Sequence, residues 1–354
     1  MSALRSMRTS YQKRPSGRSV SQSIPLRVRP AGGEPARDAP GPDVDPSFSL
    51  ALSLPDHRPR GARPPMPTVA LEPRYFDRMG SSLGDKARMV LPHLRGPAVL
   101  DVGAGGGELT AAIAGAGFRT SALDAAPDAI TRLTELGMLH EVRRGYAEQV
   151  PQLFDEPFDT IVVSALLHEV YSYGTSPDTE PILRGYDALA LTVTRCRESL
   201  RDRGRLIIRD GVMPERPLEP ATVDGLSDED VEAFHDYLRR SPHPLLRALH
   251  LRGRTLTGTR HAVAEFLLTL TWGIETFPRE ALERYQLFTL GGYSRYAGDL
   301  GFDLMRSEAV TQQGYVDALS HLRVRSGDRP WFPATNGLWV FEKRSTRQPV
   351  LHQP

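Results

Sequence analysis

Short apolar runs alternate with amphipathic segments through the middle of the chain. Five runs have the length of buried strands, the third being the weakest: 99–102, 120–124, 141–144, 160–164 and 205–209. Helical spacing of apolar positions lies between them, as at Leu109, Ala112, Ile113 and Ala116, and again over 187–200. Another helix is predicted over 75–94. This alternation predicts an α/β fold, a doubly wound and mostly parallel sheet covered by helices on both faces.

The end of the chain has a different pattern. Residues 302–310 and 338–343 are predicted strands with no long helix between them, so we expect an antiparallel hairpin that completes a seven-stranded sheet. Before them, residues 212–277 form an insertion with predicted helices over 228–240 and 262–271. Segments after the fifth strand open onto the carboxyl edge of the sheet, where ligands bind. We interpret the insertion as a helical lid over a substrate pocket; a peripheral helical decoration is the alternative.

A glycine-rich loop follows the first strand. The sequence Val99-Leu-Asp-Val-Gly-Ala-Gly-Gly-Gly-Glu108 places glycines at 103, 105 and 107 directly before a helix. Such glycines allow a sharp turn and let a ligand lie against bare main chain beside a helix N-terminus. The next strand ends in Asp124, and a carboxylate at this position is expected where the ribose diol of a nucleoside is held. Together these parts predict a nucleoside-binding βαβ unit; a plain tight turn is the alternative.

The glycine spacing distinguishes between nucleosides. A dinucleotide fingerprint would need its third glycine at position 108, which is Glu108, so a nicotinamide oxidoreductase is disfavoured. The observed Gly-x-Gly-x-Gly resembles the first motif of the class I S-adenosylmethionine-dependent methyltransferases. The resemblance covers about residues 74–211 and 278–344. It implies a terminal antiparallel hairpin, S-adenosyl-L-methionine as the cofactor, and methyl transfer as the reaction.

The resemblance also implies which residues hold the cofactor. The glycine loop would lie under the methionine part, and Asp124 would bind the ribose hydroxyls. In the family the segment after the third strand contacts the adenine; here Tyr146 replaces its usual acid, so ring stacking or plain packing are the alternatives for Tyr146. The full predicted set is Asp101, Gly103, Ala104, Gly105, Gly107, Asp124, Ala125, Tyr146, Ala147 and Ser164.

Candidate catalytic residues follow the fourth and fifth strands. His168 lies where a similar subset of small-molecule O-methyltransferases places a general-base histidine, and an imidazole suits proton removal near neutrality. Bracing the local turn is the alternative role. Asp210 is the rival base, or a cap of the next turn. Candidate substrate-binding residues are Glu169, Tyr171, Tyr173 and Trp272, with Trp331 as a further aromatic wall; core packing is the alternative for the aromatic residues.

Metal chemistry is not expected. His168 and Glu169 are adjacent, so their side chains diverge in a helix or a strand, and no second cluster of histidine and glutamate accompanies them. The single cysteine, Cys196, excludes an internal disulfide and lies on a helical apolar stripe, which predicts burial.

Composition separates residues 1–66 from the methyltransferase domain predicted over 67–344. The first segment is rich in Pro, Ser, Gly and Arg with almost no apolar periodicity, so we expect a disordered tail; a mitochondrial transit peptide is the alternative. Residues 345–354 are predicted to be a flexible C-terminus. Arginine far outnumbers lysine, a skew typical of GC-rich bacterial genomes. No apolar run has membrane-helix length, and no signal-peptide core is present, so we expect a cytoplasmic protein without a membrane partner.

An acid-free run over 237–264 contains six arginines and three histidines. It could bind a carboxylate, a phosphate or an RNA backbone, or it could be a solvated face balanced by acids elsewhere. No RNA-binding module signature accompanies it. We therefore favour methyl transfer to an oxygen or nitrogen of a small molecule. The alternatives are an RNA or nucleotide methyltransferase and a non-catalytic S-adenosylmethionine-binding module.

Overall fold

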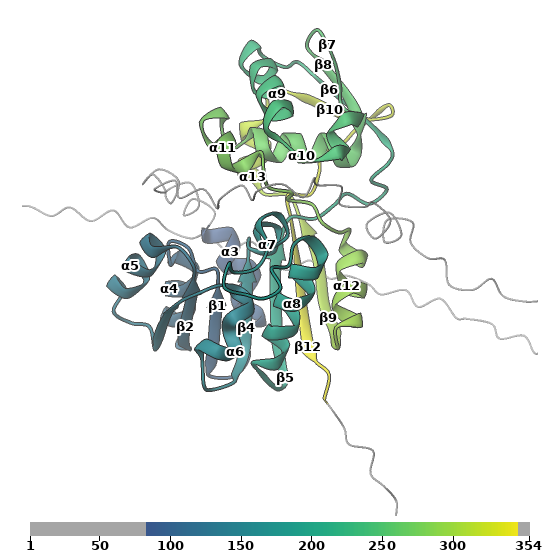
Figure 1. The fold of residues 1–354 in the computed structure, drawn as a ribbon. Coiled ribbons are helices and arrows are strands. Elements are labelled where there is room, and N and C mark those ends of the chain that lie inside the picture. Colours follow the sequence, from purple (N-terminus) through teal and green to yellow (C-terminus); the bar gives the residue numbers. More distant parts are fainter. Residues whose placement is uncertain (1–82, 346–354) are drawn as a thin grey trace, which may run out of the picture. The chain divides into compact units, whose positions relative to one another are not determined.

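The computed structural model describes residues 83–345, which lie within one compact unit of residues 44–354 (Figure 1). In chain order the strands are β1 (Ala98–Val102), β2 (Arg119–Asp124), β3 (Glu141–Arg144), β4 (Phe158–Ser164), β5 (Leu200–Asp210), β6 (Pro220–Asp224), β7 (His250–Arg252), β8 (Thr255–Thr259), β9 (Phe302–Val310), β10 (Arg323–Ser326), β11 (Arg329–Pro330) and β12 (Asn336–Lys343). The α-helices are α3 (Leu83–Val90), α4 (Glu108–Gly115), α5 (Pro127–Glu135), α6 (Val150–Leu153), α7 (Leu167–Tyr173), α8 (Gly185–Glu198), α9 (Asp228–Arg240), α10 (Arg260–Leu270), α11 (Phe277–Glu280), α12 (Leu290–Asp299) and α13 (Gln313–Ala318). The short 3-10 helices are η1 (Leu91–His93), η2 (Ala147–Gln149), η3 (Pro244–Ala248) and η4 (Ile274–Thr276).

Seven strands form the larger sheet, in the order β3-β2-β1-β4-β5-β12-β9. The first five are parallel, and β12 runs antiparallel to both β5 and β9. Register pairs Leu338 with Arg209 on one side and with Glu308 on the other. The predicted doubly wound sheet and its antiparallel C-terminal hairpin are therefore confirmed.

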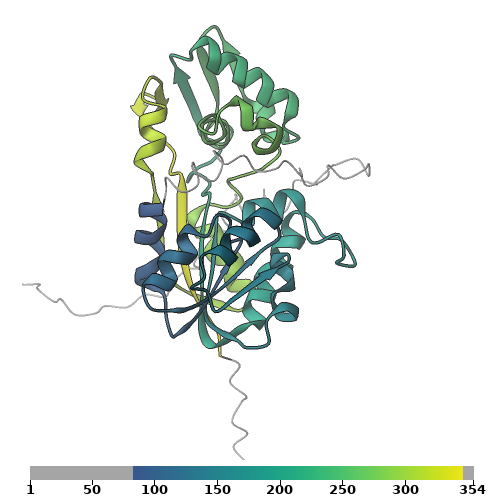
Figure 2. The same ribbon diagram turned by 90° about the vertical axis from the view of Figure 1, so that its left-hand side faces the viewer.

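Alternate residues of the buried strands pack into two hydrophobic cores, one on each face of this sheet. On β1, Val99 packs with Met89 of α3 and Ile113 of α4, whereas Leu100 faces the opposite core with residues of α8 and α12. Val99 and Leu100 are both fully buried, as expected for a central strand of a parallel sheet that is covered on both faces. Helices accordingly lie on both sides of the sheet (Figure 2).

A second, antiparallel sheet has the strand order β11-β10-β6-β8-β7. With α9, α10, α11 and α13 it forms a subdomain that we call the cap. The predicted helices over 228–240 and 262–271 are present as α9 and α10, but a purely helical insertion was an incomplete prediction. Strands such as β8 were not predicted because they are short and Thr-rich. In β8 the fully buried apolar residue is Leu256. Two of the five strands come from outside the insertion, from the segment between β9 and β12.

Some predictions fall outside the part of the chain that the structure describes. These are the tail over 1–66, the beginning of the helix over 75–94, and residues 346–354. The described part of that helix contains α3 and η1. Between residues 83 and 345, no helix combines the length and apolar character that crossing a membrane would require.

Candidate active site

The loop between β1 and α4 depends on its glycines. Gly103, Gly105 and Gly107 have φ angles of +73°, +55° and +88°, in the left-handed region that side chains other than glycine rarely adopt. The amide of Gly103 donates to the carbonyl of Leu123 on β2 at 2.8 Å, which holds the loop against the neighbouring strand. A Cβ at Gly103 would lie 2.9 Å from Leu166. The loop therefore exposes main chain that a side chain would cover.

Asp124, the last residue of β2, lies directly against this loop. Its Oδ2 accepts a hydrogen bond from the amide of Gly105, and its Oδ1 accepts one from the amide of Ala126, both at 2.8 Å. Burial raises the pKa of the carboxyl group, and the two amide donors oppose that rise. The acid and the glycine loop thus meet as the sequence predicted.

Asp101 and Ala104 brace the loop from below. Asp101 is buried, and its Oδ2 accepts a hydrogen bond from the hydroxyl of Thr110 at 2.7 Å. Burial raises the pKa of Asp101 to about 6. The amide of Ala104 donates to the carbonyl of Leu123 at 3.2 Å. Both residues therefore act on the shape of the loop.

The remaining predicted cofactor residues follow β2, β3 and β4. The carbonyl of Ala125 accepts a hydrogen bond from Arg144 at 3.3 Å. Tyr146 is half-buried at the start of η2, and Ala147 after it is buried. At the end of β4, the hydroxyl of Ser164 is buried and has no hydrogen-bond partner within residues 83–345. These residues share the carboxyl edge of the sheet with the glycine loop.

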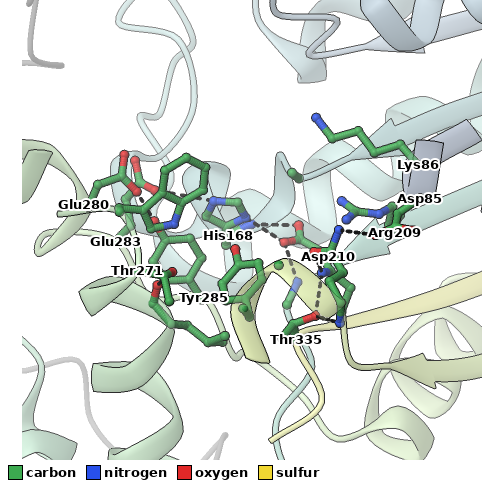
Figure 3. A pocket seen from close by; sticks show the side chains of 18 of the residues that line it. Asp85, Lys86, His168, Arg209, Asp210, Thr271, Glu280, Glu283, Tyr285 and Thr335 are labelled. Atoms are coloured by element: carbon green, nitrogen blue, oxygen red, sulfur yellow. Dashed lines mark hydrogen bonds and ion pairs between the residues drawn. The ribbon is translucent and has the colours of Figure 1, made fainter. Parts of the chain in front are cut away.

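A cavity of about 400 Å³, which we call the edge cavity, adjoins this edge (Figure 3). Its walls come from α3, the ends of β4 and β5, α7, α10 and the 280–285 segment, together with residues between 312 and 336. Ala165 stands at its wall with a φ of +56°, an uncommon conformation for alanine. Its amide donates to the carbonyl of Arg209 at 2.7 Å. The turn after β4 therefore directs α7 toward the cavity.

His168, in the first turn of α7, lies in the middle of the cavity wall. Its Nδ1 lies 2.6 Å from Oδ1 of Asp210, and its backbone amide donates to Oδ2 of Asp210 at 3.2 Å. Its Nε2 lies 3.4 Å from Oε2 of Glu283. The ring packs on Tyr285, with 4.8 Å between ring centroids. The structure therefore brings the two predicted catalytic residues together and adds a second carboxylate.

The protonation of His168 depends on these two carboxylates. Burial alone would lower the pKa of the imidazole, but Asp210 and then Glu283 outweigh it and hold the pKa well above 6.5. The oxygens of Asp210 accept from the ring and the amide of His168 and from the amide of Gly211 at 2.8 Å. Asp210 is thus occupied as an acceptor, whereas Nε2 of His168 faces the cavity.

Glu169 and Glu283 are joined through Arg279. The guanidinium donates to Glu169 at 2.9 Å and to Glu283 at 3.1 Å. Burial raises the pKa of Glu169 to about 7, and nearby Glu283 acts in the same direction against Arg279. The pKa of Glu283 is lowered because His168 and Arg279 outweigh its burial. The cluster links α7 of the sheet domain to the cap.

This cluster changes the question of a metal. His168, Glu169 and Glu283 each offer one ligand atom, and these atoms all lie within 4.8 Å of one another. The sequence contains no evident second cluster of histidine and glutamate, yet Glu283 joins His168 and Glu169 from a distant segment. Arg279 already neutralises two of the carboxylates. The expectation that no metal is used stays a prediction.

The predicted substrate-binding residues separate into two groups. Glu169 and Trp272 line the edge cavity. Tyr171 and Tyr173 do not: Tyr171 packs on Tyr186, and the hydroxyl of Tyr173 donates to Glu283 at 3.0 Å. The additional candidate Trp331 packs in the cap core with the guanidinium of Arg260 5.5 Å from its ring centroid.

Sequence reasoning missed several residues that line the cavity, notably Glu280, Glu283, Tyr285, Lys86 and Arg209. The first three lie in a segment of alternating charges that is typical of a solvated helix, but both glutamates are only 2% exposed. Their position in the sequence could have indicated a role in the site, because they lie where the chain returns from the insertion to the edge of the sheet.

The arginine run of the cap is largely neutralised. Arg239 and Arg240 pair with Asp236 at 3.0 and 2.7 Å, both within α9. Arg254 pairs with Asp228 at 2.7 Å, and Arg260 with Glu219 at 2.8 Å. The acids that balance the run lie just before it in sequence, so the interpretation as a balanced, solvated face is supported.

The sequence from β1 into β5 matches a known protein family. Residues 100–208 match the family described as a methyltransferase domain, and they contain the glycine loop, Asp124 and His168. Over these residues the chain is similar to a methyltransferase domain, in agreement with the resemblance seen in the glycine loop. A search of curated proteins found no match.

Solved structures with a similar fold are also methyltransferases by their descriptions. The CcbJ methyltransferase from Streptomyces caelestis is 12% identical, with 75% of this chain and 90% of that chain covered and a TM-score of 0.42. Magnesium protoporphyrin IX methyltransferase from Synechocystis PCC 6803 is 11% identical, with 75% and 83% covered and a TM-score of 0.40. An O-methyltransferase family 2 protein from Planctomyces limnophilus is 15% identical, with 75% and 61% covered and a TM-score of 0.39.

Proposed function

We propose that this protein transfers a methyl group from S-adenosyl-L-methionine to an oxygen or nitrogen of a small-molecule acceptor. The observation that carries the proposal is the contact between Asp124 and the amide of Gly105. It supports the proposal because a carboxylate, the group suited to a ribose diol, lies beside bare main chain. The cofactor supplies a methyl group already activated on a sulfonium.

The residues present fit this cofactor. A side chain at Gly103 would fill the cradle against Leu166, so the glycine keeps that space open. The buried hydroxyl of Ser164 lacks a protein partner among the described residues and offers one polar contact at the same edge. Glu108, directly after the loop, would repel a pyrophosphate but not a ligand without phosphate. Asp101, the glycine loop, Asp124, Ala125, Tyr146, Ala147 and Ser164 would therefore hold S-adenosylmethionine.

His168 is the proposed proton acceptor. Its Nε2 faces the edge cavity, and an acceptor hydroxyl or amine entering there would take the place of Glu283 beside that nitrogen. Asp210 fixes the ring through Nδ1 and is therefore proposed as a positioning residue and not as the base. Residues of the cap, such as Leu268 and Trp272, line the cavity from the other side. Glu169, with its pKa near 7, is the second group in the cavity wall that can exchange a proton near neutrality.

The alternatives have less support. A cavity of about 400 Å³ is within the range typical of small-molecule sites. The RNA alternative needed the arginine run as one exposed basic stripe, but four of its arginines are ion-paired. The non-catalytic alternative would be favoured if His168 and Asp210 both pointed away from the cofactor pocket; both line the edge cavity, at the same edge of the sheet as the glycine loop.

The test combines binding and product analysis on the full chain. Calorimetry with S-adenosylhomocysteine is expected to give saturable binding. Mass spectrometry of the protein with S-adenosylmethionine and a metabolite extract is expected to show a compound that gains one methyl group. Absence of cofactor binding would refute the proposal. Binding without a methylated product in extracts of several sources would favour the non-catalytic alternative.

A further inference from the structure

Arg209 is a buried cation with unusual surroundings. It lies on β5 next to Asp210 and is only 3% exposed. Its Nε is buried without a hydrogen-bond partner, and within residues 83–345 its side chain makes no ion pair. Buried arginines are normally paired, because an uncompensated charge in the interior costs several kcal/mol. An unpaired guanidinium at this position therefore indicates a partner other than residues 83–345, and a bound anion fits that role.

The guanidinium lies at the wall of the edge cavity. Figure 3 shows Arg209 and Lys86 on one side of His168, and Glu280 and Glu283 on the other. Burial and then the neighbouring charge of Arg209 lower the pKa of Lys86 to about 8. Arg209 and Lys86 therefore lie close enough for the charge of one to act on the other. The cavity consequently has a basic end and an acidic end.

The acid at the basic end does not neutralise Arg209. Oδ1 of Asp85 accepts from Arg88 at 2.6 Å, and its Oδ2 accepts from Gln312 at 3.4 Å. No oxygen of Asp85 comes within ion-pair distance of Arg209 in the described structure. Asp85 and the adjacent Asp210 both favour the charged form of Arg209, but neither forms an ion pair with its guanidinium within residues 83–345.

We propose that the methyl acceptor carries an oxyanion, a carboxylate or a phosphate, that binds the guanidinium of Arg209. This inference rests on the proposed methyltransferase function. The planar guanidinium offers a fork of donors that matches two oxygens of either group. With its anion at this end, the acceptor would extend past His168 toward the acidic end, which places its nucleophile beside Nε2.

The cofactor's own carboxylate is a different anion, and the topology separates it from Arg209. The glycine loop follows β1, whereas Arg209 is on β5, and β4 lies between these strands. The proposal therefore assigns the acceptor's oxyanion to the end of β5, two strands away from β1 and its loop. An experiment can distinguish the two anions because S-adenosylhomocysteine retains the cofactor's carboxylate.

The probes are inorganic phosphate and acetate, titrated separately into the full chain at constant ionic strength, with and without saturating S-adenosylhomocysteine. Melting temperature and calorimetry are the readouts. We expect at least one probe to bind saturably in both conditions. In Arg209→Met the dissociation constant should rise about tenfold or more, as the loss of charged hydrogen bonds predicts. Arg209→Lys should bind more weakly than wild type, and the exposed Arg216→Met control should bind like wild type.

Two further results bear on the assignment. Without added anion, Arg209→Met should melt no lower than wild type, because the arginine has no ion-pair partner among residues 83–345 to lose. A lower melting temperature with unchanged anion binding would assign Arg209 a structural role and overturn the proposal. The proposal would also be overturned if neither phosphate nor acetate binds to the wild-type protein, or if S-adenosylhomocysteine abolishes their binding. If S-adenosylhomocysteine fails to bind while the anion response depends on Arg209, the methyltransferase proposal fails and the oxyanion site stands.

Discussion

Asp210 holds His168 by both its ring and its backbone. Oδ1 of the carboxylate lies 2.6 Å from Nδ1 of the imidazole, and Oδ2 accepts the histidine's amide at 3.2 Å. The side chain cannot rotate without breaking the first contact, and α7 cannot shift without breaking the second. The pair thus connects the end of β5 to the first turn of α7 and leaves Nε2, 3.4 Å from Glu283, as the nitrogen that we propose for proton transfer.

Removing the imidazole should separate catalysis from cofactor binding. His168→Ala is expected to lower turnover by roughly 10²–10⁴-fold, the range for loss of a general base. Affinity for S-adenosylhomocysteine should not change, because within residues 83–345 no hydrogen bond or ion pair joins His168 to the glycine loop. Steady-state kinetics and calorimetry measure the two quantities, with the exposed His235→Ala as the control. A joint loss of affinity and melting temperature would show that His168 only braces the turn.

The rate should increase with pH through an ionisation above 6.5. Neutral imidazole is the active form, and Asp210 and Glu283 favour the charged form, so the ionisation of His168 moves to higher pH. Glu283→Gln removes one of these carboxylates and should move the inflection of kcat/KM to lower pH. His168→Ala should abolish the inflection. An inflection that stays at the same pH in Glu283→Gln would contradict the assignment.

Asp210→Asn tests positioning against direct proton transfer. Asparagine keeps one oxygen acceptor but loses the charge, so the pKa of His168 should fall and turnover should decrease about tenfold or more. If Asp210 were the base itself, His168→Ala would retain most of the activity and Asp210→Asn would lose it. Kinetics of the two variants side by side distinguish these mechanisms.

The ribose-binding role of Asp124 predicts a specific loss of affinity. Asp124→Ala should weaken binding of S-adenosylhomocysteine by about 2–3 kcal/mol, the cost of a lost charged hydrogen-bond partner. Asp128→Ala, an exposed acid in the first turn of α5, is the control with the same charge change. Unchanged affinity in Asp124→Ala would refute the assignment.

Arg279 should matter for stability in a pH-dependent way. Arg279→Met leaves Glu169 and Glu283 without their shared cation and should cost about 2–4 kcal/mol of unfolding free energy near pH 8. The loss should shrink toward pH 5, because protonation removes the stranded charges, beginning with Glu169 near its pKa of about 7. Denaturant unfolding at the two pH values measures this. An equal loss at both would show that the packing of Arg279 matters more than its charge.

The sequence predicted what depends on neighbours along the chain. The strands, the glycine loop and Asp124 are local patterns, and His168 and Asp210 follow strand ends that meet at one edge. Their pairing was not predictable from position alone, and neither was Glu283, since its charged segment resembles a solvated helix. The cap sheet was missed for a related reason. Its strands have weak apolar alternation and become buried only when segments far apart in the sequence pair.

The composition of the cap sheet also determines the order in which the protein can fold. Arg323 of β10 pairs with Asp224 of β6, a contact that spans about a hundred residues. During synthesis, β6, β7 and β8 therefore leave the ribosome long before their last partners do. The cap cannot complete its own sheet before the final two strands of the larger sheet are nearly made. The two subdomains should accordingly acquire their native structure together, late and in one cooperative step.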